Sequence, residues 1–146
     1  MAKGPFRADQ VGSFLRPKEL MDAREKLKNG DIDGGALREV EDRLITEVVK
    51  LQEAAGMKAV TDGDFRRTSW SGDFLTAIDG VEMRSTTERI GSEPPAGVPK
   101  GGMVPNWQPP TPTTTKKLAR PEGGIQRGDF EFLQGATSQT PKVCIP

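Results

Sequence analysis

The pattern of residues 37–61 most constrains the fold, because it joins an amphipathic helix directly to a buried strand. Apolar residues recur at spacings of three and four, at Leu37, Val40, Leu44, Val48, Leu51 and Ala55. This period predicts a helix with one apolar face, which we expect to end at Gly56 and to be capped at its start by Asp31 or Asp33. Residues 57–61 form a short apolar run with β-branched side chains, which favours a buried strand.

Other segments continue this alternation of strand and helix. A shorter helix is predicted over residues 17–28, where proline is tolerated in the first turn. Strands are predicted over residues 6–11 ("FRADQV") and 142–146 ("KVCIP"), and residues 129–141 indicate a helix and a turn before the last strand. Such alternation implies an α/β fold with parallel strands joined by right-handed crossovers. In a (β/α) barrel, the side chains that follow each strand lie on the face where binding and catalysis occur.

Residues 94–121 interrupt this order. Eight of the 12 prolines fall in this segment, and it shows neither a helical nor a strand period. A loop of this length is either a functional lid or a disordered linker, and both interpretations stay open. Four basic residues lie in it without an acidic one between residues 97 and 121. They could meet an anionic ligand, although a solvated basic loop is the commoner case; they are Lys100, Lys116, Lys117 and Arg120.

Composition excludes several function classes. The 21 basic residues balance 21 acidic ones, so no overall charge draws the chain to nucleic acid or to an anionic membrane. The sequence contains no run of eighteen apolar residues, and its first residues show no apolar signal region, so neither a membrane span nor secretion is indicated. Cys144 is the single cysteine, and this fits a reducing compartment. We therefore expect a cytoplasmic protein.

Two polar turns are candidates for a binding site. Asp62 and Asp64 flank Gly63 directly after the strand predicted at 57–61, so their carboxylates should share one side of the turn. An aspartate-rich surface turn is the commoner explanation, but Arg66, Arg67 and Trp70 follow and offer charge partners and an aromatic wall. Near the start of the chain, Gly12 and Ser13 form a second turn, which offers free backbone N–H groups and a hydroxyl.

These motifs together resemble a known family. The segments "FRADQVGSFLRP", "VEDRLITEVVKLQEAAGMKAVTDGDFRRTSW" and "DFEFLQGATSQTPKVCIP" resemble, in this order, the start of the cobalamin-independent methionine synthases, in particular the short proteins called methionine synthase II-like. The resemblance covers essentially the whole chain. It implies a TIM barrel that transfers a methyl group from a methylated folate to the thiol of homocysteine, which a bound zinc ion holds as a thiolate. Related members transfer alkyl groups to other thiols, including coenzyme M.

The resemblance also implies roles for particular residues. The turn of Val11, Gly12 and Ser13 would hold the amino acid part of homocysteine, and Asp64 would contact the same ligand. N–H donors suit a carboxylate, and an aspartate suits an ammonium group. Most methionine synthases have a glutamate in place of this aspartate, so a different thiol is an open alternative. Further candidate pocket residues are Asp9, Arg66 and Trp70.

The chain departs from the family in its histidines and its metal ligands. Many relatives have a histidine in place of Gln10 and another near Ser71, whereas this sequence contains no histidine. The zinc ligands of the family are a histidine, two cysteines and a glutamate from later strands. Zinc is therefore expected in the complete family protein, and we expect this chain alone to bind none and to be inactive.

The length of the chain predicts an incomplete TIM (β/α)8 barrel. A complete one takes about 250 residues, so 146 residues supply about the first three strands with their helices. We expect one partial domain over residues 1–146, with a strand-helix-strand core (1–93), the Pro/Gly-rich loop (94–121) and a helix with the third strand (122–146). Cys144 would be a small buried side chain in that strand.

The predicted function is that of an N-terminal portion of a methyltransferase. The parent enzyme would take a homocysteine-like thiol and a methylated folate. A non-catalytic relative that binds an amino acid or a protein partner is the alternative, as is an alkyl transferase acting on another thiol. Because a cut barrel exposes strand edges, we also expect self-association or contact with the missing part of the barrel.

Overall fold

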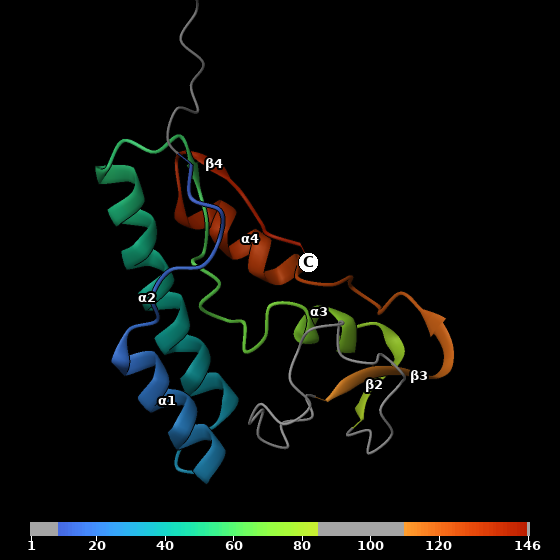
Figure 1. Ribbon diagram of the computed structural model, residues 1–146. Helices are drawn as coiled ribbons and strands as arrows, with labels where there is room; N and C mark the ends of the chain where they lie inside the picture. The colour runs from blue at the N-terminus through green and yellow to red at the C-terminus, as the bar shows by residue number, and fades with distance from the viewer. Residues whose placement is uncertain (1–8, 85–109, 146) are drawn as a thin grey trace, which may run out of the picture. The chain divides into compact units, whose positions relative to one another are not determined.

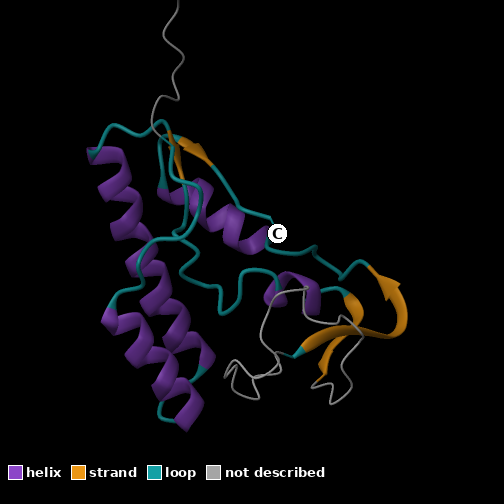
Figure 2. Ribbon diagram, viewed as in Figure 1, coloured by secondary structure: helices purple, strands orange, loops and turns teal. Residues whose placement is uncertain are grey.

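The computed structural model describes residues 9–84 and 110–145 as a mixed α/β structure in two compact units (Figures 1 and 2). The first unit comprises residues 1–70 and 126–146, and the second comprises residues 71–125. The first contains α1 (Lys18–Asn29), α2 (Gly34–Ala54), β1 (Ala59–Val60), α4 (Arg127–Ala136) and β4 (Thr140–Pro141). The second contains α3 (Gly72–Thr76), β2 (Asp79–Arg84) and β3 (Thr111–Ala119). Within residues 9–84 and 110–145, no helix is both long enough and apolar enough to cross a membrane.

The two predicted N-terminal helices are confirmed, with their capping residues. Asp33 caps α2, because its side chain accepts a hydrogen bond of 2.8 Å from the amide of Ala36. Both α1 and α2 are followed by a glycine with positive φ, Gly30 at 81° and Gly56 at 82°. Glycine adopts this left-handed conformation without the steric cost of a Cβ atom. Figure 1 shows α1 and α2 side by side in the first unit.

The buried face of α2 differs from the predicted one. Leu51 was expected in the apolar stripe, but it is 61% exposed, whereas its neighbour Gln52 is 1% exposed. Two adjacent apolar pairs set this face; they are Leu44 with Ile45 and Val48 with Val49. Because helical residues four positions apart lie on one face, Gln52 lies over Val48 and is carried into the core.

The core of the first unit gathers side chains from α1, α2, β1, the turn after β1 and α4. Its buried members are Leu20, Leu44, Ile45, Val48, Val49, Val60, Phe65 and Leu133. Leu133 is fully buried and is the buried residue that α4 contributes. The apolar face of α4 therefore ties residues 126–145 to the N-terminal helices.

The expected parallel pairing of strands is confirmed for β1 and β4. Ala59 pairs with Thr140 and Val60 with Pro141, and the amide of Lys142 donates to the carbonyl of Val60 at 2.8 Å. The predicted third strand over residues 142–146 is wrong in position, because pairing occurs at 140–141 and ends where β1 enters the turn at Asp62. Residues 9–11 of the predicted first strand form no strand, and residues 6–8 lie outside the described part. The partial (β/α)8 barrel stays a prediction.

The second unit corrects the predicted loop over residues 94–121. Residues 111–119 form β3, which pairs with β2 in antiparallel orientation, for example at Glu82 with Thr113. Threonine-rich sequence is typical of strands, since β-branched side chains pack well on a pleated surface, and this signal outweighs Pro112. Gly80 is needed at the bulge, because a Cβ atom there would lie 2.8 Å from the carbonyl oxygen of Lys116. Residues 94–109, with the predicted lid or linker, lie outside the described residues.

Candidate functional site

The two candidate turns lie against each other within the first unit. The hydroxyl of Thr61 donates to the carbonyl of Gly12 at 2.9 Å, and the amide of Phe14 donates to the carbonyl of Gly63 at 3.0 Å. The hydroxyl of Ser13 donates to Oδ2 of Asp64 at 2.7 Å. Residues about fifty positions apart are therefore joined through both backbone and side chains.

The backbone of the second turn positions the carboxylate of Asp64, whose Oδ1 also lies 3.6 Å from Nε of Arg67. Gly63 and Asp64 both have positive φ, at 72° and 56°. Aspartate tolerates this region better than most residues because its short side chain bonds locally. Here the amide of Asp64 donates to Oδ1 of Asp62 at 3.0 Å, which is the local bond of an aspartate turn.

Gly12 lies where a side chain would not fit. A Cβ atom on this residue would be 2.6 Å from Sγ of Cys144 and 3.2 Å from Oδ2 of Asp64. Cys144 also contacts the carbonyl of Val11. The expectation of a buried Cys144 in a strand is thus corrected: it is half-buried, follows β4 and borders the site. Burial and the nearby carboxylate of Asp64 raise the pKa of the Cys144 thiol, so this thiol is a poor nucleophile at neutral pH.

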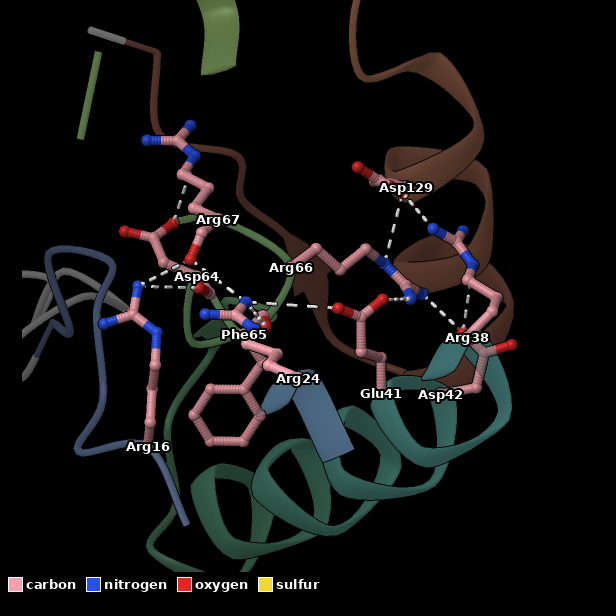
Figure 3. A network of polar contacts seen from close by, with 10 residues as sticks. All are labelled: Arg16, Arg24, Arg38, Glu41, Asp42, Asp64, Phe65, Arg66, Arg67 and Asp129. Atoms are coloured by element: carbon pink, nitrogen blue, oxygen red, sulfur yellow. Dashed lines mark hydrogen bonds and ion pairs between the residues drawn. The ribbon is translucent and has the colours of Figure 1, made fainter. Parts of the chain in front are cut away.

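Two arginines hold the backbone of residues 64–67 (Figure 3). The guanidinium of Arg16 donates to the carbonyls of Asp64 and Arg67 at 3.2 and 3.0 Å. Arg24 of α1 donates to the carbonyls of Phe65 and Arg67 at 2.6 and 3.1 Å. The carbonyl of Asp64 also accepts from the amide of Arg67 at 3.2 Å. The two arginines add side-chain donors to it and to the carbonyls of Phe65 and Arg67, so the turn that carries Asp64 is tied to α1 and to the segment preceding it.

Arg66 was expected in the pocket, but it extends away from Asp64 toward α2 and α4 (Figure 3). Its guanidinium pairs with Glu41 at 3.4 Å and with Asp42 at 2.6 Å, and it lies 4.9 Å from the ring centre of Phe132. Nε lies 3.1 Å from Asp129 without the geometry of a hydrogen bond, so this contact is electrostatic. Arg66 therefore belongs to the packing of α2 against α4.

The remaining candidate residues lie at the edge of the two turns or on the surface. Asp9 forms an ion pair with Lys142 at 2.5 Å, which links the start of the described chain to the residues after β4. Val11 and Trp70 are 82% and 79% exposed. The structure thus brings together Gly12, Ser13 and Asp64, but it does not place Arg66 with them.

Titration of Asp62 should make stability fall as the pH rises. Burial raises the pKa of Asp62 above the ordinary value of 3.8, so the folded chain binds more protons than the unfolded chain above that pH. Stability then declines through the window between 3.8 and the raised pKa. Asp62→Asn keeps the acceptor for the amide of Asp64, and we expect it to raise the free energy of unfolding at pH 7, with the gain vanishing below pH 3.8. Urea unfolding at several pH values measures this.

Glu53 supplies a control of opposite sign. A hydrogen bond from Thr137 lowers the pKa of Glu53 below 4.5, so its contribution is present above that value and lost as the pH falls. Glu53→Gln should therefore destabilise the chain at pH 7 and have little effect in acid. An Asp62→Asn protein with the same pH profile as the unaltered chain would contradict the role of Asp62.

A zinc ion does not fit the residues described. In ranges 9–84 and 110–145, no three side chains of histidine, cysteine, aspartate or glutamate are grouped closely enough to ligate a metal. Structural and catalytic zinc sites need three or four such ligands. No chemical step is therefore assigned to a metal on these residues.

Residues without an expected role hold the turns in place. Thr61 was assigned to a strand and Gln52 to no role, yet both are fully buried, and Gln52 Nε2 donates to the carbonyl of Thr61 at 2.8 Å. The sequence does contain an indication for Gln52. It lies four residues after Val48, and residues at this spacing share one face of a helix. The bonds of Arg16 had no signal in the sequence, because they join segments that only the fold brings together.

The chain is similar in sequence to known bacterial proteins. The chain is 48% identical to the uncharacterized protein YxjH of Bacillus subtilis (strain 168) over 99% of its own length and 36% of that protein. It is 26% identical to a 5-methyltetrahydropteroyltriglutamate–homocysteine methyltransferase of a Synechococcus strain, over 52% of its own length and 10% of that protein. The chain thus spans about a third of the first relative and less of the second. No protein-family model matches it.

A solved structure extends this similarity to three dimensions. It is that of a Listeria monocytogenes protein provisionally named a vitamin-B12-independent methionine synthase. The TM-score is 0.72 at 34% identity, and the match covers 97% of this chain and 36% of that one. At this identity the similarity extends beyond the fold to the sequence itself.

Proposed function

Because this chain is related to part of the cobalamin-independent methionine synthases, we propose that it is a portion of a methyltransferase of that kind. The whole enzyme would transfer a methyl group from methyltetrahydrofolate to the sulfur of homocysteine. The described residues would contribute the half of the pocket that binds the amino acid part of this thiol. Gly12, Ser13 and Asp64 are the residues that would bind it, with Val11 at the edge.

One observation carries this proposal, namely the convergence of Ser13 and Asp64. Their side chains are joined at 2.7 Å although the residues are far apart in the sequence. A carboxylate beside a turn with backbone N–H groups offers both charges that an α-amino acid requires, since Asp64 suits the ammonium group and the N–H groups suit the carboxylate. Gly12 allows the turn to pack closely against Cys144 and Asp64, which holds Ser13 beside that carboxylate.

Zinc would activate the thiol in the complete enzyme, as the resemblance implies. The described residues do not provide its ligands, so they bind and orient the amino acid part and do not carry the transfer step. The folate and the zinc would be held by parts of the parent protein beyond the matched third.

Replacing Asp64 tests the proposal. Asp64→Ala should weaken the binding of methionine by about 1.5–3 kcal/mol, because a charge-assisted hydrogen bond to the ammonium group is lost. Isothermal titration calorimetry on the 146-residue chain gives the affinity. Asp31→Ala is the matched control, since Asp31 is an exposed aspartate at the end of α1, and it should leave binding unchanged. Equal affinity in the unaltered chain and Asp64→Ala would remove Asp64 from the site.

A further inference from the structure

Thr61 is the buried residue through which the two turns are joined. It is 1% exposed, and its hydroxyl donates to the carbonyl of Gly12 at 2.9 Å and accepts from the amide of Gly63 at 3.2 Å. Its own backbone is fixed from α2, because the amide of Thr61 donates to Oε1 of Gln52 at 2.9 Å and its carbonyl accepts from Nε2 at 2.8 Å. The hydroxyl therefore has a defined position in the core.

The bond to Gly12 determines the direction of a second group. The carbonyl of Gly12 and the amide of Ser13 belong to one peptide unit, which is planar and, like the others described, not cis. In a trans peptide the C=O and N–H bonds point in opposite directions. Because Thr61 holds the carbonyl on its buried side, the N–H of Ser13 must point away from Thr61.

That N–H group is free to bind a ligand. Ser13 is exposed, and within residues 9–84 and 110–145 its amide donates to no protein acceptor. Its hydroxyl is already directed at Asp64. The Ser13 amide is thus a free donor next to the carboxylate of Asp64. The buried side chain of Thr61 holds this amide in one orientation.

We infer that Thr61 is a positioning residue, whose hydroxyl aims the Ser13 amide at the carboxylate of an amino acid ligand. This inference rests on the proposed function of the same site, and it assigns recognition of the ligand carboxylate to one peptide unit. Asp64 recognises the ammonium group, so the two ends of the ligand are read by different groups. Thr61 acts on one of these ends alone.

The test compares two ligands in three proteins. Methionine carries both charged groups, whereas methioninol keeps the ammonium group and replaces the carboxylate with a hydroxymethyl group. Thr61→Val preserves the shape of the side chain but removes its hydroxyl, and Thr61→Ser keeps the hydroxyl. By calorimetry, Thr61→Val should bind methionine about tenfold more weakly, the effect of one partly misdirected hydrogen bond to a charged group. Its affinity for methioninol should stay the same, and Thr61→Ser should bind both ligands as the unaltered chain does.

Other results would overturn the inference in distinguishable ways. Equal losses for both ligands in Thr61→Val would show that Thr61 only supports the fold, and unchanged methionine affinity would show that the hydroxyl does not aim the amide. An unaltered chain that binds neither ligand would instead contradict the proposal that Gly12, Ser13 and Asp64 bind an amino acid.

A second measurement tests the inference even if Thr61→Val does not fold. In the unaltered chain and in Thr61→Ser, the ¹H–¹⁵N signal of the Ser13 amide should move downfield with methionine and stay in place with methioninol. A signal that responds equally to both ligands would exclude the Ser13 amide as the carboxylate donor.

Discussion

Replacing Arg66 with alanine is expected to lower the free energy of unfolding by about 3–5 kcal/mol, the cost of removing one partner from a buried ion pair. The side chains of Arg66 and Glu41 are 6% and 9% exposed. Burial raises the pKa of Glu41, and Arg66 counteracts this effect. Without Arg66, the carboxylate of Glu41 stays buried with much less compensating charge. Urea unfolding followed by circular dichroism measures the change.

Two further variants identify the cause of that loss. Arg43→Ala removes an exposed arginine that pairs with Glu19 and Glu47, and exposed pairs contribute little, so this control should change stability only slightly. Glu41→Leu in the Arg66→Ala background removes the isolated carboxylate and should recover much of the loss. Failure of this second change to recover stability would show that Arg66 acts mainly through Asp42, Asp129 or Phe132 rather than through Glu41.

Leu133→Ala is expected to cost about 2–5 kcal/mol of stability, the range for a buried leucine that leaves a cavity. Leu133 is fully buried and is the side chain through which α4 enters the core. Because the core of the first unit includes residues from both of its chain segments, the loss should appear in a single transition for that unit. Thermal unfolding and urea titration both measure it.

Leu51→Ala is the matched control for this prediction. It makes the same change on α2, but Leu51 is 61% exposed, so little apolar area leaves contact with other side chains. A loss well under 1 kcal/mol is expected, since surface substitutions usually fall within about 0.5 kcal/mol. Equal losses at the two positions would contradict the core described for the first unit.

Local signals predicted the helices well, and long-range contacts explain what they missed. The cap at Asp33 and the end at Gly56 were visible because each depends on neighbouring residues alone. The strand at 142–146 was misplaced because its apolar side chains resemble a strand, whereas pairing is set by the position of Ala59 and Val60 on the partner. The strand at 111–119 was hidden because prolines in the same segment suggested a loop.

The sequence pointed to the residues of the candidate site, but not to the side chains that hold them in place. Gly12, Ser13 and Asp64 were identified from turn chemistry and from the family resemblance, and the structure brings them together. Arg66 follows Asp64 by two residues, and the turn sends its side chain in another direction. The hydrogen bond from Thr61 to Gly12 joins residues 49 apart, a separation over which no sequence period gives information.

The division of the first unit between residues 1–70 and 126–146 has a consequence for biosynthesis. A ribosome extends the chain from its N-terminus at about 5–20 residues per second, so α1, α2 and β1 emerge well before Leu133 and Thr140. During that interval β1 lacks its parallel partner and the apolar face of α2 lacks α4. The core of the first unit therefore cannot be completed until the whole second unit has been translated. Until then its apolar side chains stay accessible to chaperones.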